Sequence, residues 1–250
     1  WFLHQRNGIS CGNFSGRTGE TDRDCSLSMV SAVSSVAENM GHILGAIESL
    51  AIGRPVKIIG VTKYQPVGKL IEALDAGVQS LAVNYAQEGE LFRQALGDRK
   101  AEWHFIGHIQ SRKVKYLSYY HCVQSLDRIE IAADLNDRLE KIGRAVYALV
   151  EVNIGDEPQK SGVSPKRLAE FLDEVTQLPN LKIQGLMCMP PLLEPVEKRR
   201  PFFEKMTELF LRLKDPYSFE VLSMGTSEDY LLAIKSGSNM VRLGTCLFGP

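Results

Sequence analysis

Lys63 is the residue whose position in the sequence most clearly suggests chemistry. It directly follows the apolar run VKIIGVT (residues 56–62), which is typical of a strand buried on both faces of a parallel sheet. An amine at the end of such a strand could attack a carbonyl carbon and form a Schiff base. Lys160, in the string QKSG after a later apolar run, is its main rival. The alternative for each is an ordinary solvated lysine.

Two later strings could bind an anion. LSMGTSEDY (residues 222–230) turns from a strand into a helix start, where backbone N–H groups are free, and VRLGT (residues 241–245) adds an arginine near the end of the next strand. Barrels built of alternating strands and helices frequently bind phosphate with the loops after strands seven and eight. The candidate residues are Ser223, Gly225, Thr226, Ser227, Arg242, Gly244 and Thr245. The alternative is a plain helix cap and tight turn, which the nearby arginine disfavours.

A nucleophilic amine combined with a phosphate site predicts a phosphorylated carbonyl compound as the ligand. One such compound is the cofactor pyridoxal 5′-phosphate (PLP). Another is a sugar phosphate cleaved by a Schiff-base aldolase. The chemistry of these residues leaves both open.

Eight apolar runs alternate with helical patterns and would bring these residues to one end of a barrel. The expected strands are residues 56–62, 80–84, 102–107, 121–125, 146–154, 181–188, 219–225 and 240–249. A further helix precedes them, with Val36, Met40, Ile43 and Ile47 along one face. The sequence therefore predicts an α/β fold, a single (β/α)8 TIM-type barrel with an extra N-terminal helix. An open doubly wound sheet is the alternative, but no GxGxxG string follows a strand.

The composition argues against several classes of protein. Lys and Arg number 29 and Asp and Glu number 30, so the net charge of −1 gives no positive field for nucleic acid or anionic membranes. Five cysteines without a CxxC pair disfavour a disulfide framework and a zinc site. His104 and His108 fall on a strand pattern, where packing or hydrogen bonding is expected instead of metal binding. No run of 18 apolar residues occurs, and we expect a cytoplasmic protein.

The first residues of the sequence differ in pattern from the rest. Residues 1–28 mix Gly, Ser, Arg and acidic residues without apolar periodicity. We expect a disordered N-terminal extension there and a cofactor-binding barrel at residues 29–250. A transit peptide is the alternative for the extension, although Glu20, Asp22 and Asp24 count against it.

Seven strings, found in one order along residues 31–249, carry a family resemblance. They are GVTKYQP, VNYAQE, WHFIGHIQSRKVKY, VNIGDEPQKSG, GLMCMPP, LSMGTSEDYLLAI and VRLGTCLFG. Together they resemble the pyridoxal phosphate homeostasis protein family, which is similar to the barrel domain of alanine racemase. The resemblance implies PLP held as an aldimine on Lys63, phosphate contacts from the SMGTS and RLGT strings, and a cofactor contact from Asn84.

The sequence departs from the family pattern at two of these places. Val83 stands before Asn84 where the family usually has Glu, so any role of that acid is absent here. Thr226 stands where Met is common, and a backbone donor at this position should tolerate the change.

The resemblance also bears on whether the protein is an enzyme. A racemase needs two acid–base groups on opposite faces of its substrate, and in alanine racemase a separate β domain helps to complete the site. The sequence ends with the barrel, so we expect a non-catalytic PLP carrier in vitamin B6 homeostasis, monomeric and delivering PLP to apoenzymes. The alternatives are a small amino-acid racemase with a different second base and a Schiff-base aldolase.

Overall fold

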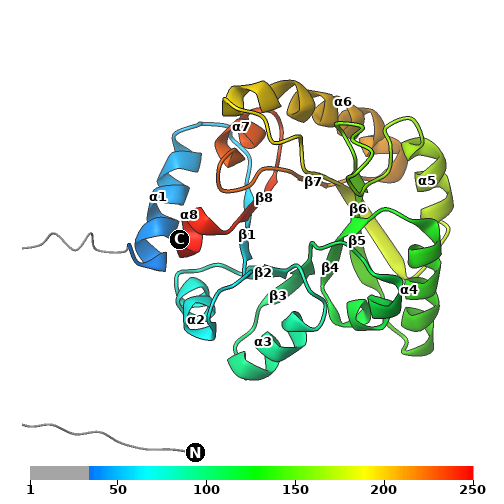
Figure 1. Cartoon of the computed structure of the whole chain (residues 1–250), viewed down its shortest axis with the longest axis horizontal. Coiled ribbons are helices and arrows are strands. Elements are labelled where there is room, and N and C mark those ends of the chain that lie inside the picture. The colour runs from blue at the N-terminus through cyan, green and yellow to red at the C-terminus, as the bar shows by residue number, and fades with distance from the viewer. Residues whose placement is uncertain (1–33, 250) are drawn as a thin grey trace, which may run out of the picture. The chain divides into compact units, whose positions relative to one another are not determined.

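The computed structural model describes residues 34–249 as a closed barrel of eight parallel strands in chain order, with helices around the outside (Figure 1). The strands are β1 (Lys57–Val61), β2 (Ser80–Val83), β3 (Glu102–Phe105), β4 (Cys122–Leu126), β5 (Val146–Val152), β6 (Leu181–Cys188), β7 (Val221–Ser223) and β8 (Met240–Leu243). The predicted (β/α)8 barrel is therefore confirmed. The predictions for residues 1–28 lie outside the described residues.

The connecting segments are mostly α-helices, with two 3₁₀ helices. They are α1 (Val36–Glu48), α2 (Val67–Asp75), α3 (Glu88–Leu96), η1 (Ser111–Tyr119), α4 (Ile129–Lys141), α5 (Leu168–Val175), η2 (Val196–Arg199), α6 (Arg200–Tyr217), α7 (Tyr230–Lys235) and α8 (Thr245–Phe248). The extra helix expected before the first strand is α1. A capping box between Ser35 and Glu38 begins it, and its buried face carries Val36, Met40 and Ile43.

Strand pairing closes the barrel between its first and last strands. Gly60 of β1 lies opposite Leu243 of β8 on one side and Leu81 of β2 on the other. Strands buried on both faces need apolar residues throughout, which explains why the runs in the sequence show little alternation. A small cluster fills the barrel interior, consisting of Ile59, Ala82, Cys122, Leu149, Met187 and Met240, and a larger cluster packs the helices on the outside.

Two predicted boundaries were wrong. The last strand was expected to reach residue 249, but β8 ends at Leu243 because the chain turns at Gly244 into α8, whose Leu247 N–H donates back to the Gly244 carbonyl at 3.0 Å. The strand expected at residues 219–225 is shorter, and β7 covers Val221–Ser223. In both cases buried residues continue past the strand: Met224 follows β7, and Leu247 and Phe248 lie in α8 beyond β8.

No helix within residues 34–249 is both long enough and apolar enough to cross a membrane.

Candidate functional site

Lys63 lies in a tight turn directly after β1. The Gln65 N–H donates to the Thr62 carbonyl at 2.9 Å, which places Lys63 and Tyr64 at the centre of the turn. The turn is anchored to β2, because the N–H and the hydroxyl of Thr62 both donate to the Ala82 carbonyl, at 2.9 and 3.1 Å. Tyr64 has a φ of 62°, which is uncommon for a bulky residue, and such conformations concentrate at functional sites.

The two candidate lysines differ in what their amines contact. Lys160 Nζ lies 2.7 Å from Glu157 Oε1 and donates to the Pro190 carbonyl at 3.2 Å. Lys63 is exposed, and within residues 34–249 its Nζ has no ion-pair or hydrogen-bond partner and lies 4.9 Å from the centroid of the Tyr64 ring. An amine that already contacts a carboxylate and a carbonyl is less available to attack a carbonyl carbon, so the geometry favours Lys63 as the nucleophile.

The loops that follow β7 and β8 meet at the hydroxyl of Ser227. Its Oγ accepts hydrogen bonds from the Gly244 N–H at 3.1 Å and the Cys246 N–H at 3.3 Å. A hydroxyl has two lone pairs and one proton, so this oxygen can only donate further. The N–H groups of Ser227 and Thr245 have no acceptor among the described residues. An anion is the ligand that would satisfy such a set of donors.

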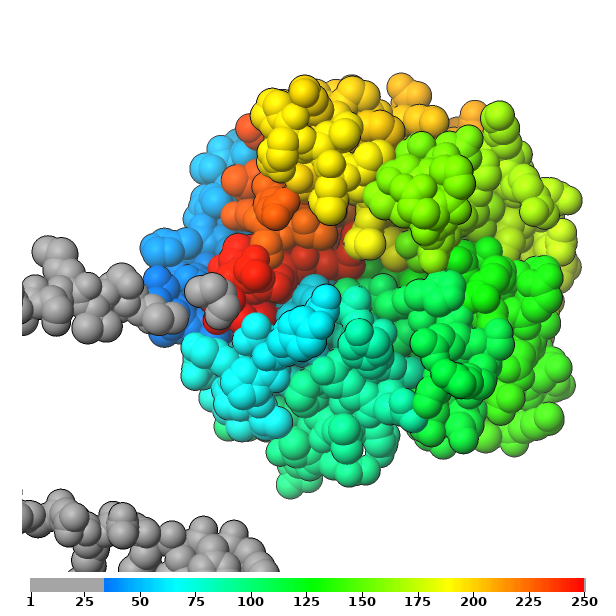
Figure 2. All heavy atoms as spheres, in the orientation of Figure 1, coloured from blue at the N-terminus to red at the C-terminus, as the bar shows by residue number. Residues whose placement is uncertain are grey.

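This junction lies close to the Lys63 turn. β1 pairs with β8, and a Cβ added to Gly244 would lie 3.8 Å from the Cβ of Val61. Figure 2 shows the segments around Lys63 (cyan), α7 (orange) and α8 (red) on one face of the barrel. The amine and the anion donors therefore share the carboxyl ends of neighbouring strands, where barrels of this type carry their functional groups.

Thr226 has a different role from the one expected. Both its N–H and its hydroxyl donate to Asp229 Oδ1, at 2.7 and 3.1 Å. Since these donors are already used, Thr226 shapes the turn and does not present a free backbone donor. Gly225, just before it, has a φ of 99° and packs against α7.

Arg242 is buried inside the barrel and is not an open side chain at the mouth. It is 3% exposed, and it donates to the carbonyl of Ser223 at 3.0 Å, to the hydroxyl of Ser223 at 2.6 Å and to the carbonyl of Cys188 at 2.9 Å. Burial lowers the pKa of the guanidinium, but arginine stays charged in proteins. The residue thus provides a fixed positive charge in the interior below the mouth.

A chain of hydrogen bonds extends from Arg242 across the interior. The Ser223 hydroxyl accepts from Arg242 and donates to Gln124 Oε1 at 2.7 Å, and Gln124 Nε2 lies 2.9 Å from His104 Nδ1. Arginine can only donate, so the Ser223 hydroxyl must donate to Gln124 Oε1, and Gln124 Nε2 must donate to His104 Nδ1. The proton of a neutral His104 ring therefore lies on Nε2. Burial lowers the pKa of His104, in agreement with a neutral ring.

His108 bonds separately to Ser161 Oγ at 2.8 Å, so the two histidines share no ligand position.

Glu151 of β5 is a buried acid on the same inner surface. It is 9% exposed, and burial, reinforced by the nearby Asp127 and opposed by Arg242, raises its pKa to about 7. A carboxyl group with this pKa can exchange protons near neutral pH.

Asn84 lies just after β2 with an unsatisfied group. Its Oδ1 is buried and has no hydrogen-bond partner among the described residues. Buried polar atoms are normally paired, so this atom indicates room for a ligand donor or a water. The position agrees with a ligand contact near the Lys63 turn, because β2 neighbours β1.

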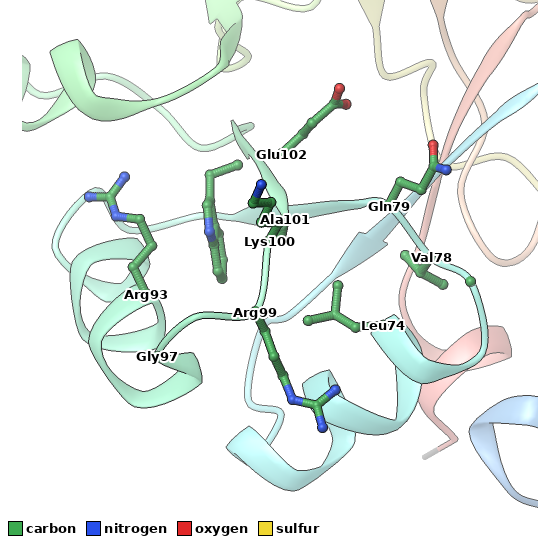
Figure 3. Close-up of a pocket in the computed structure, with 11 residues that line it drawn as sticks. Leu74, Val78, Gln79, Arg93, Gly97, Arg99, Lys100, Ala101 and Glu102 are labelled. Atoms are coloured by element: carbon green, nitrogen blue, oxygen red, sulfur yellow. The ribbon is translucent and has the colours of Figure 1, made fainter.

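A pocket of about 810 Å³ lies away from these residues, around the amino ends of β2 and β3 (Figure 3). Arg99 there donates to Asp75, and Arg93 to Glu90 and the Tyr119 carbonyl. In Figure 3 the two arginines project in different directions and share no centre. The two arginines therefore do not converge on one ligand position, and the candidate residues described above lie at the opposite end of the strands.

Comparison with known proteins shows which family the chain belongs to. The family model described as alanine racemase, N-terminal domain, matches residues 37–250. A protein of Aquifex aeolicus (strain VF5) named pyridoxal phosphate homeostasis protein is 40% identical over 196 residues, which cover 77% of this chain and 86% of the relative. The chain belongs to the pyridoxal phosphate homeostasis protein family.

Solved structures extend the comparison. PipY of Synechococcus elongatus PCC7942, solved with PLP bound, is 28% identical and superimposes with a TM-score of 0.76, covering 86% of this chain and 100% of PipY. Alanine racemase of Clostridium difficile 630 is 18% identical with a TM-score of 0.68, and the match covers 84% of this chain but 56% of the racemase. The racemase therefore shares the fold of this chain. Its own chain extends well beyond the region that matches.

Two polar residues of the site were missed by the sequence reasoning. Gln124 and Glu151 interrupt apolar strands at positions that face inward, and this pattern alone could have identified them.

Proposed function

We propose that this protein binds PLP at the carboxyl end of the barrel, with Lys63 as the amine that attaches the cofactor's aldehyde. The main observation is that the amine of Lys63, which has no partner among residues 34–249, follows a strand that pairs with β8, and that β8 leads into the donor set of Ser227 and Thr245. When bound, PLP supplies an aldehyde that condenses reversibly with primary amines. PipY, a structural relative, has been solved with PLP bound.

The residues present fit the phosphate of the cofactor. The Ser227 hydroxyl can only donate, because Gly244 and Cys246 occupy its lone pairs. The free N–H groups of Ser227 and Thr245 add two donors to the same place. Phosphate oxygens accept such bonds strongly, and backbone donors need no reorganisation on binding.

Arg242 and Asn84 support the remainder of the ligand. Arg242 is held by Ser223 and Cys188, so its charge stays fixed while a ligand enters or leaves. Asn84 Oδ1 is free to accept a hydrogen bond from the ligand or from a bridging water. Gly225 and Thr226 contribute by shaping the loop.

We infer further that the protein stores or delivers PLP in the cytoplasm, without turnover of its own. Relatives named pyridoxal phosphate homeostasis protein support this role. Among the described residues, Tyr64 (82% exposed) and Leu192 (81% exposed) follow strand ends at the mouth, which supports a site that is open to water and to competing amines. Apoenzymes that accept PLP are the proposed partners.

Glu151 supports a second candidate, a small amino-acid racemase. Its pKa of about 7 suits an acid–base group, and its strand, β5, lies opposite β1 in the closed order of eight. In this alternative Lys63 and Glu151 would act as the acid–base groups on the two opposite faces of the substrate.

The two candidates are separated by incubating the loaded protein with a panel of amino acids and, separately, with a PLP-dependent apoenzyme. The carrier role predicts reactivation of the apoenzyme by wild type and no racemisation. Racemisation at ordinary enzyme rates that disappears in both Lys63→Ala and Glu151→Gln would establish the racemase instead.

A further inference from the structure

Arg199 is a fully buried cation outside the residues assigned to the ligand. It ends η2, in the connection between β6 and α6, and it is 1% exposed. Its Nη1 donates to Asp229 Oδ2 at 2.9 Å, and its Nη2 donates to Glu194 at 2.9 Å and Glu228 at 3.1 Å. The Nε donates to the Leu193 carbonyl at 3.1 Å. All three nitrogens of the guanidinium are thus engaged, which is unusual for a residue in a connecting loop.

Asp229 links this arginine to the anion-binding loop. While Oδ2 accepts from Arg199, Oδ1 accepts from the N–H and the hydroxyl of Thr226. Asp229 is itself buried, with a side chain that is 3% exposed. One carboxylate therefore connects the loop after β6 to the turn after β7.

The turn held by Asp229 carries the phosphate donors. Ser227 lies between Thr226 and Asp229, and its hydroxyl joins the turn to Gly244 and Cys246 after β8. If Arg199 were absent, Oδ2 of the buried Asp229 would lose its charge-assisted hydrogen bond, and the carboxylate would rotate toward another donor or toward water. That rotation weakens the hydrogen bonds from Thr226 to Oδ1 and moves Ser227.

We propose that Arg199 is a positioning residue that, through Asp229, holds the Thr226–Asp229 turn in the geometry that binds the phosphate of the ligand. Arg199 does not touch the ligand. The inference rests on the proposed function, and it adds that selectivity for a phosphorylated over an unphosphorylated ligand depends on a residue from a different loop.

The test compares two ligands that differ only in the phosphate. Affinities for PLP and for pyridoxal are measured by absorbance titration in wild type, Arg199→Met, Arg199→Lys and Asp229→Asn, together with melting temperatures. The control is Arg138→Met, which removes an arginine from an exposed pair with Asp134 on α4.

Arg199→Met is expected to weaken PLP binding by roughly tenfold or more, as for a lost charge-assisted hydrogen bond, while pyridoxal binding stays within about twofold. Asp229→Asn should do the same and Arg199→Lys should recover part of the loss. The double variant Arg199→Met/Asp229→Asn should be no worse than either single variant, since both act through one link. Arg138→Met should change neither affinity.

Equal weakening for both ligands, or unchanged PLP affinity in Arg199→Met, would overturn the proposal. If Arg199→Met alone fails to fold, the double variant decides, because removing both charges of a buried pair is better tolerated than removing one. A wild type that binds PLP no more tightly than pyridoxal would contradict the proposed phosphate site itself. A wild-type preference that persists in the double variant would contradict the role of Arg199 alone.

Discussion

Arg242 donates a hydrogen bond of 2.6 Å to the hydroxyl of Ser223, a residue of the neighbouring strand that is itself fully buried. The arginine also donates to the carbonyls of Ser223 and Cys188, so three hydrogen bonds to neighbouring strands hold its guanidinium in place. A fixed charge loses little conformational entropy when a ligand binds. The same pair begins the hydrogen-bond chain that leads through Gln124 to His104.

Replacing Arg242 with alanine should weaken cofactor retention. Arg242 donates to Ser223 and Cys188 and would act on the phosphate through its fixed charge, so we expect a smaller loss than the roughly 10 to 150-fold of a direct charge-assisted hydrogen bond. Equilibrium dialysis against PLP measures the change, and circular dichroism should show that the barrel stays folded. Arg138→Ala, on the surface of α4, serves as the control. An unchanged affinity would show that the charge of Arg242 plays no part in binding.

Borohydride reduction of the loaded protein should attach the cofactor to the peptide that contains Lys63. The reason is that Lys63 Nζ is unpaired within the described residues, whereas Lys160 is held by Glu157 and the Pro190 carbonyl. Peptide mapping by mass spectrometry identifies the labelled lysine. Lys160→Ala should keep the label and Lys63→Ala should lose it. Labelling mainly at Lys160 would contradict the assignment.

Glu151 should make the stability of the protein depend on pH. Its pKa is raised from 4.5 to about 7, so the folded state binds the proton more tightly than the unfolded state. This contribution is complete below about pH 4.5 and is lost as the pH rises to about 7, at about 1.4 kcal/mol per pKa unit, or roughly 3 kcal/mol in all. Chemical denaturation of wild type and Glu151→Gln across this range measures the difference.

The expected result is that Glu151→Gln gains stability relative to wild type as the pH rises, because glutamine has no proton to lose. A constant difference between the two proteins from pH 4.5 to 7.5 would mean that Glu151 is ionised throughout in the folded state. In Arg242→Ala, the pH at which this stability is lost should move upward, because the charge of Arg242 lowers the pKa of Glu151.

Gly225→Ala should destabilise the fold more than Gly97→Ala. Both glycines have positive φ angles, 99° and 57°, so both substitutions strain the backbone. A Cβ on Gly225 would also lie 2.7 Å from the Cβ of Ala233, whereas nothing lies within 4 Å of one on Gly97. We expect a loss of about 1 to 2 kcal/mol at Gly97 and at least about 3 kcal/mol at Gly225, measured by urea unfolding. Equal losses would show that the contact with α7 relaxes without cost.

The sequence by itself determined the order of the elements and the end of the barrel at which the candidate residues lie. Strands buried on both faces appear as short apolar runs, so their number and alternation could be counted without coordinates. Lys63 was identified for a local reason, since it directly follows such a run, whereas Asn84 was identified through the family resemblance. The strings around Gly225 and Gly244 were identified in the same way. Boundaries were less certain because buried residues beyond a strand continue the apolar pattern, as Leu247 and Phe248 of α8 do after β8.

Only the tertiary structure decided which of these polar groups remain available to a ligand. Thr226 looked like a donor in the sequence, but Asp229 uses both its N–H and its hydroxyl. Arg242 looked like a phosphate ligand, but barrel closure brings it to carbonyls up to 54 residues away. Hydrogen bonding depends on distance and direction in space, which residue order does not specify once the partners lie on different strands and loops. Arg199, 30 residues from Asp229, could be recognised for the same reason only after the chain had folded.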